Sequence, residues 1–258
     1  VLSLIAGNAA VGIFAAAYQL TLNLLQIAVQ PITLAAESVS YRVYELEGLE
    51  PTRRFMQNFI GLLLIVVSSV GVTLYLLRYP VIGVLIHPDY GAAVHLLVYL
   101  IPAITLIQLS PTLARSFQYV KRTLDLSRYT LSAGVANLAL NFALVPFMAE
   151  VGSAIASMVC YLIYGSSMYL GGLRYVAWPL PWKTAVSLVV PAGLLALFHL
   201  LLGSTFDLQS VGIVALAAVI YVVVYLLLAG LTLIAGRAFL GEQLDFVVTI
   251  FKLRAVRA

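Results

Sequence analysis

Polar side chains recur every three or four residues between positions 19 and 44. They are Gln19, Asn23, Gln26, Gln30, Thr33, Glu37, Ser40 and Tyr44. This spacing places them near one face of a helix for about seven turns, with leucine, isoleucine and valine opposite. Such a series can form hydrogen bonds that hold helices together, or it can line a watery path for a polar solute. Its unbroken length favours the lining of a cavity.

A second set of polar residues follows further along the chain. It comprises Gln108, Thr112 and Arg115, in a segment that also contains Pro102 and Pro111, and then Asn137 and Asn141 at a spacing of one helical turn. Proline inside a membrane helix frees a backbone carbonyl, which is tolerated beside a cavity or a neighbouring helix. We therefore expect both sets to face the same interior. The predicted substrate cavity contains Gln19, Asn23, Gln26, Gln30, Glu37, Gln108, Thr112, Arg115, Asn137 and Asn141.

Two of these residues carry charge, and each has more than one possible role. The Arg115 guanidinium could extend to the membrane surface, or it could project into the cavity and bind an anionic head group through paired hydrogen bonds. Glu37 could pair with an arginine, carry a coupling proton, or lie at the membrane interface. For Glu37, pairing or a surface position is favoured over proton transfer.

Other reactive residue types are scarce. The chain has one cysteine, Cys160, and three histidines, His87, His95 and His199. No disulfide can form within the chain, and no cysteine–histidine group has the spacing of metal ligands. We expect no metal and no cofactor. The basic isoelectric point of 9.2 does not indicate nucleic-acid binding, because the basic residues gather in the connections between apolar segments.

Composition defines the elements that position these residues. Hydrophobic residues make up 63% of the 258-residue chain and charged residues 9%, and the mean hydropathy is +1.06. A soluble domain carries roughly 25% charged residues, so a soluble enzyme, a disordered chain and a disulfide-stabilised scaffold are excluded. The sequence predicts an integral membrane protein.

A membrane-spanning helix needs about 20 mostly apolar residues. Seven stretches meet this requirement: 11–36, 55–77, 91–113, 126–146, 151–173, 182–203 and 211–235. Several are apolar on every face, whereas a membrane β-barrel alternates apolar and polar residues. We therefore predict an all-α, polytopic helical bundle.

The basic residues predict its orientation. Of the 14 lysines and arginines, only Arg78 falls on the opposite side from the others when the spans alternate. Because loops rich in lysine and arginine stay in the cytoplasm, we predict a multi-pass protein of the inner (cytoplasmic) membrane with a cytoplasmic C-terminus. Residues 1–7 would end a preceding helix, residues 8–174 would form a core of five helices, residues 175–236 a peripheral pair, and residues 237–258 a cytoplasmic amphipathic tail.

Three sequence motifs resemble those of a known family. They are VGIFAAAY at 11–18, SYRVY at 40–44, and NLALNFALVP at 137–146 followed by VGSAIAS at 151–157. In order and spacing they are similar to the C-terminal half of the polysaccharide flippases (O-antigen translocases) of the multidrug/oligosaccharidyl-lipid/polysaccharide exporter superfamily. The chain departs from the family pattern at Glu37 and at the turn Met148-Ala149-Glu150.

This resemblance implies the second lobe of a two-lobed transporter of twelve to fourteen helices. Such proteins move a lipid-linked oligosaccharide to the outer leaflet by alternating access, often coupled to a proton or sodium gradient. The implied partners are this substrate, membrane lipid and the N-terminal lobe of the same chain, with no nucleic acid and no enzymatic activity. Because the chain does not begin with methionine, we expect it to be part of a longer protein.

Three other functions compete with this one. A cation-coupled multidrug antiporter of the same superfamily would favour acidic residues in the cavity, where the sequence offers Glu37 at most. A membrane-embedded polysaccharide polymerase or ligase would need an outer catalytic loop, and only 79–90 has the length for one. A structural or assembly subunit would not need two series of polar residues.

Overall fold

The computed structural model describes residues 1–86, 90–202 and 210–235. Within these ranges the protein is helical and contains no strand, which confirms the predicted all-α class. The helices are α1 (Leu2–Ile5), α2 (Gly7–Leu46), α3 (Leu49–Leu76), α4 (Arg78–Leu85), α5 (Ala93–Leu113), α6 (Arg115–Tyr119), α7 (Thr123–Gly172), α8 (Trp182–Ser187), α9 (Val189–Leu202) and α10 (Val211–Ala235). The predicted tail at 237–258 and His87 lie outside the described residues.

Six helical stretches are long and apolar enough to cross a membrane: Gly7–Leu46, Leu49–Leu76, Ala93–Tyr119, Thr123–Gly172, Trp182–Leu201 and Val211–Leu233. Large apolar side chains such as Leu200, Leu216 and Leu227 are exposed on them. Because exposed apolar surface of this extent is stable in lipid and not in water, the chain is a multi-pass membrane protein.

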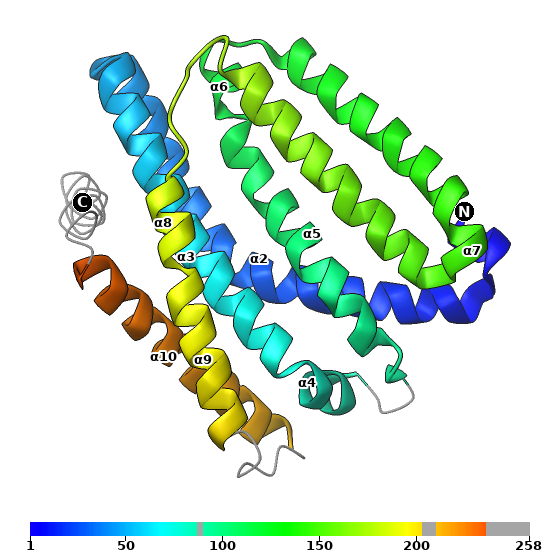
Figure 1. Cartoon of the computed structure of the whole chain (residues 1–258). Helices are drawn as coiled ribbons and strands as arrows, with labels where there is room; N and C mark the ends of the chain where they lie inside the picture. The colour runs from blue at the N-terminus through cyan, green and yellow to red at the C-terminus, as the bar shows by residue number, and fades with distance from the viewer. Residues whose placement is uncertain (87–89, 203–209, 236–258) are drawn as a thin grey trace.

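Helix α7 is a hairpin rather than a straight rod. Its fifty residues are interrupted at Ala149, where φ is 45° and ψ is −125°, and Figure 1 shows the chain reversing its direction there. The two limbs are joined by a hydrogen bond from Ser153 to the Asn141 side chain and by one from the Cys160 thiol to the Ala133 carbonyl (2.9 Å). The limbs coincide with two of the predicted spans, 126–146 and 151–173.

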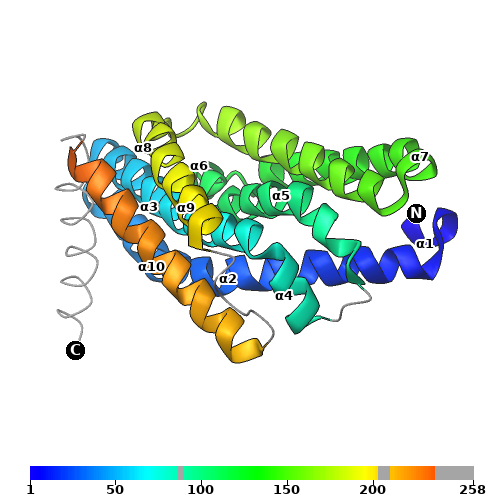
Figure 2. The ribbon, with the colours of Figure 1, turned by 60° about the horizontal axis from the view of Figure 1, so that its bottom comes forward.

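Helix α2 connects the two sides of the bundle. Its C-terminal half lies beside α3, whereas its N-terminal half crosses toward α1 and the tip of α7 (Figures 1 and 2). Pro31 lies inside this forty-residue helix, where a proline removes a hydrogen bond and bends the axis. The bend allows one helix to pack against α3, α5 and α7.

The apolar core lies between α2, α3 and α5. Leu25, Met56, Leu63, Leu97 and Leu100 are fully buried in it. Helices α9 and α10 pack against the other side of α3, at the edge of the bundle in Figure 1. There the Tyr225 hydroxyl bonds to Ser68 (3.0 Å) and to the Leu188 carbonyl (3.3 Å).

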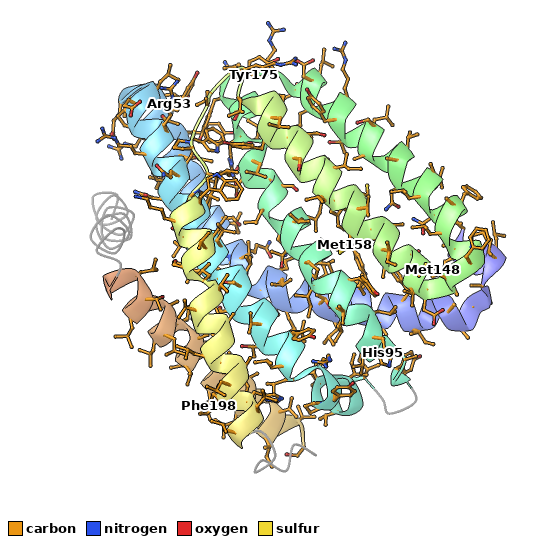
Figure 3. The ribbon with its side chains drawn as sticks, viewed as in Figure 1. Arg53, His95, Met148, Met158, Tyr175 and Phe198 are labelled. Carbon is orange, nitrogen blue, oxygen red and sulfur yellow. The ribbon has the colours of Figure 1, made fainter. Side chains whose placement is uncertain are left out.

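Basic residues gather at one end of the bundle. Figure 3 places Arg53 and Tyr175 at one end and His95 and Phe198 at the other. The turn between α2 and α3, helix α6 and the linker after α7 share the Arg53 end, whereas α4, which begins at Arg78, lies at the opposite end (Figure 1). The linker is fixed there by a hydrogen bond from the Tyr175 hydroxyl to Asp125 (2.8 Å), which raises the pKa of Tyr175.

Candidate functional site

The first half of the α2 series is exposed. Gln19, Asn23, Gln26 and Gln30 lie on the surface of the described chain, whereas Thr21, Leu25 and Val29 on the other face of the helix are buried. The Gln26 amide bonds only weakly to Gln30, at 3.4 Å. These four side chains, which we call the polar face of α2, thus present amide groups along a membrane-spanning helix.

The second half of the series is turned into the bundle. Thr33 donates a hydrogen bond to a backbone carbonyl one turn earlier, Ser40 is buried, and Tyr44 stacks on Tyr119 with ring centroids 4.7 Å apart. The eight positions predicted to share one face therefore lie in two environments. The spacing is regular throughout, but the four positions of the first half are exposed, whereas Ser40 is buried and Thr33, Glu37 and Tyr44 are partly buried.

Arg115 and Glu37 form an ion pair between α6 and α2. The distance from Arg115 Nη1 to Glu37 Oε1 is 2.8 Å, and the side chains are 9% and 46% exposed. The guanidinium also lies 5.5 Å from the centroid of the Tyr41 ring. Of the three roles considered for Glu37, the structure shows the pairing with an arginine. The Arg115 guanidinium, in turn, neither extends to the surface nor projects freely into a cavity.

Aromatic residues surround this ion pair. Tyr41 and Tyr119 are in edge-on contact at 5.4 Å, and the Tyr119 hydroxyl lies 3.3 Å from the Met56 sulfur. The Tyr41 hydroxyl donates to the Gln118 side chain at 3.2 Å. The pair thus joins α2 to α6 in surroundings partly shielded from water, where a charge interaction is stronger than on an open surface.

Gln108 and Thr112 lie on α5, before α6. Thr112 is buried, and Gln108 is partly buried, with its amide nitrogen lacking a hydrogen-bond partner among the described residues. Neither residue belongs to the polar face of α2. The predicted cavity residues thus come from α2, α5, α6 and α7.

Asn137 and Asn141 do line a cavity. It has a volume of about 580 Å³ and lies between the N-terminal part of the chain and the α7 hairpin. The Asn141 amide donates to the Asn137 side chain at 3.1 Å, and Asn141 also accepts the Ser153 hydroxyl. A second cavity of about 320 Å³ shares Asn137 with the first.

Four further residues with polar side chains, all outside the predicted set, line the first cavity: Tyr18, Ser153, Ser157 and Tyr161. The hydroxyls of Tyr18 and Tyr161 are 2.9 Å apart and link α2 to α7. Ser153, Ser157 and Tyr161 recur at intervals of one turn, a pattern that could have indicated their shared face. Tyr18 adjoins Gln19 in sequence but points elsewhere, so only the tertiary structure identifies it.

The chemistry of this lining is neutral. It offers amides, hydroxyls and aromatic rings and no acidic or basic side chain. Within the described part of the chain no cluster of histidine, cysteine and acidic residues could hold a metal ion. Such a lining suits hydrogen bonding to a neutral polar group.

No family model, no curated protein and no solved structure matches the chain. The family resemblance of its motifs therefore remains a prediction.

Proposed function

We propose that this chain forms one lobe of a flippase that moves a lipid-linked oligosaccharide across the cytoplasmic membrane by alternating access. The observation that carries the proposal is the polar face of α2. Its side chains Gln19, Asn23, Gln26 and Gln30 are exposed on a membrane-spanning helix. Polar groups facing lipid are costly, so this face requires a watery path or a polar partner. In a two-lobed transporter, the space between the lobes supplies that path.

The chemistry of the face suits a glycan. Each amide both donates and accepts hydrogen bonds, as sugar hydroxyls do, and the four side chains carry no charge. The ion pair between Arg115 and Glu37 would hold α2 against α6 in one of the alternating states. Its opening would give an anionic head group access to the guanidinium.

A cation-coupled multidrug antiporter is the second candidate. It would require a carboxylate that is free to bind a cation. Among the predicted cavity residues, which all lie in the described part of the chain, the acidic residue is Glu37. Its carboxylate is paired with Arg115. A flippase accommodates that pairing better.

The test uses the full-length protein in sealed vesicles with a fluorescent lipid-linked oligosaccharide. The double variant Gln26→Leu/Gln30→Leu keeps side-chain size and removes four amide hydrogen-bonding groups. We expect the rate of translocation to fall by roughly thirtyfold, because the loss of one substrate hydrogen bond at each glutamine, about 1 kcal/mol apiece, raises the barrier by about 2 kcal/mol.

The matched control is Ile27→Leu/Leu34→Ile, which exchanges exposed apolar residues on the same helix and should leave the rate unchanged. Equal rates for wild type and the glutamine variant would contradict the proposal. Export of a cationic dye, without movement of the glycolipid, would favour the antiporter.

A further inference from the structure

A separate pocket lies at the basic end of the bundle. It has a volume of about 510 Å³ and is formed by the first turns of α3 and by the linker that follows α7. We call it the interfacial pocket. The residues that matter for its chemistry are Glu50, Arg53, Arg54, Gln57, Tyr169 and Trp178. None of them belongs to the polar face of α2 or to the cavity beside α7.

Two buried hydrogen-bond donors in this pocket have no acceptor. The Trp178 side chain is only 2% exposed, and its indole nitrogen bonds to nothing in the described chain. The Arg53 Nε atom is also buried and lacks a partner there. Buried donors are nearly always paired in folded proteins, and an unpaired one costs free energy that an incoming acceptor would recover.

The linker holds Trp178 in this position. The Tyr169 hydroxyl donates to the Trp178 carbonyl at 3.2 Å, which ties the linker to the end of α7. The indole ring is thereby packed into the core, and Trp178 is one of the residues that border the pocket. The donor is therefore fixed by the fold and does not depend on a mobile surface side chain.

The charges of the pocket favour an anion. Arg53 Nη1 and Arg54 Nε lie 3.4 and 3.7 Å from the Glu50 carboxylate. One carboxylate offsets one of the two guanidinium groups, which leaves a net positive charge. The Gln57 amide supplies a further donor, and the Arg53 Nε and the Trp178 indole nitrogen are buried, unpaired donors of residues that border the same pocket. A tetrahedral oxyanion, with several lone pairs on each oxygen, matches this set, and guanidinium groups bind phosphate in pairs of hydrogen bonds.

We propose that the interfacial pocket binds a phosphate group, and that its source is the head group of an anionic phospholipid. Figure 3 shows Arg53 at the same end of the bundle as Tyr175. Basic pockets between membrane helices bind anionic head groups on the cytoplasmic side. Tryptophan is enriched at the membrane–water interface, where such head groups lie. A soluble phosphate would satisfy the same donors. The proposal does not depend on the flippase function.

The experiment measures lipid binding to the full-length protein in detergent by native mass spectrometry. Phosphatidylglycerol is compared with phosphatidylcholine, whose phosphate is neutralised by choline, and inorganic phosphate is titrated separately. We expect phosphatidylglycerol to bind at least about tenfold more tightly, since a charge-assisted hydrogen bond contributes this much. Arg53→Gln should remove most of that preference.

Arg128→Gln is the matched control, because Arg128 also pairs with an acidic residue three positions away, at Asp125, and does not line the pocket. Trp178→Phe tests the indole donor while it keeps an aromatic ring in the core. Phosphatidylglycerol binding that both pocket variants weaken and Arg128→Gln does not would support the lipid source. Binding of inorganic phosphate alone, with the same dependence on Arg53 and Trp178, would support the phosphate site and assign it to a soluble anion. An equal effect of Arg128→Gln, or no binding of either anion, would overturn the proposal.

Discussion

The two members of the Arg115–Glu37 pair differ in how deeply they are buried. The guanidinium is 9% exposed and the carboxylate 46%. A buried charge without its partner is strongly destabilising, whereas a half-exposed carboxylate can be solvated by water. The two residues therefore contribute unequally to stability although they share one hydrogen bond.

We expect Glu37→Leu to destabilise the protein by on the order of 2 kcal/mol, because it leaves the Arg115 guanidinium buried and unpaired. Adding Arg115→Leu to that variant should recover part of the loss, since the unpaired charge is then removed. Thermal unfolding in detergent of both single variants and the double variant completes the thermodynamic cycle. Additive effects of the two substitutions would show that the ion pair contributes nothing to stability.

At the scale of single residues, the sequence predicted which face of a helix a residue occupies better than it predicted which residue it contacts. The spacing of the α2 series correctly placed Gln19, Asn23, Gln26 and Gln30 on one face, because helical geometry alone decides that. It could not determine that α6 would bring Arg115 against Glu37. That contact joins positions far apart in sequence and depends on how α2 bends and packs.

At the scale of elements, the α7 hairpin turns at an unfavourable residue. Ala149 has a φ of 45°, a region in which a Cβ atom clashes with the backbone and which glycine adopts freely. The limbs also approach closely beside the turn: a Cβ atom added at Gly152 would lie 2.7 Å from the Leu144 carbonyl oxygen. The hairpin thus has a glycine where the limbs touch and an alanine where the backbone turns.

Ala149→Gly should therefore stabilise the protein by about 1 kcal/mol, because it relieves the strain of positive φ. Ala139→Gly is the control. Ala139 is exposed within the first limb of the hairpin, and glycine there should destabilise by about 1 kcal/mol. Unfolding temperatures of the two variants should thus shift in opposite directions. A loss of stability in Ala149→Gly would mean that the turn is not strained.

The helices themselves were largely predictable because long apolar stretches define them. The break between 126–146 and 151–173 was expected, and the chain turns at Ala149 between them. Helix α2 extends beyond the predicted span 11–36 at both ends, from Gly7 to Leu46, and the regular polar series had already indicated helix as far as Tyr44. Polar residues at its two ends lowered the local hydropathy without interrupting the helix. The division of 182–203 into α8 and α9 near Leu188 was not indicated by composition.

At the scale of the whole molecule, three features lie in different parts of the bundle. The polar face of α2 is exposed between its ends, the ion pair lies where α2 meets α6, and the interfacial pocket lies beside the first turns of α3. A movement that separated α2 from α6 would change the first two features together and leave the third in place.

The arrangement of charged ends also gives a prediction for the orientation of the whole protein. Arg54 and Arg128 are 78% and 80% exposed at the side chain, on the predicted cytoplasmic side, whereas Tyr79 is exposed on α4 at the opposite end.

In a Cys160→Ser background, each of these three residues is replaced by cysteine in turn, and intact cells are treated with a membrane-impermeant maleimide. We expect labelling of Tyr79→Cys alone, because loops rich in arginine and lysine remain in the cytoplasm. After the membrane is permeabilised, Arg54→Cys and Arg128→Cys should also be labelled. This labelling shows that both cysteines can react with the maleimide. Labelling of Arg54→Cys or Arg128→Cys in intact cells, with Tyr79→Cys unlabelled, would show the opposite orientation. The direction of transport proposed for the protein would then be reversed as well.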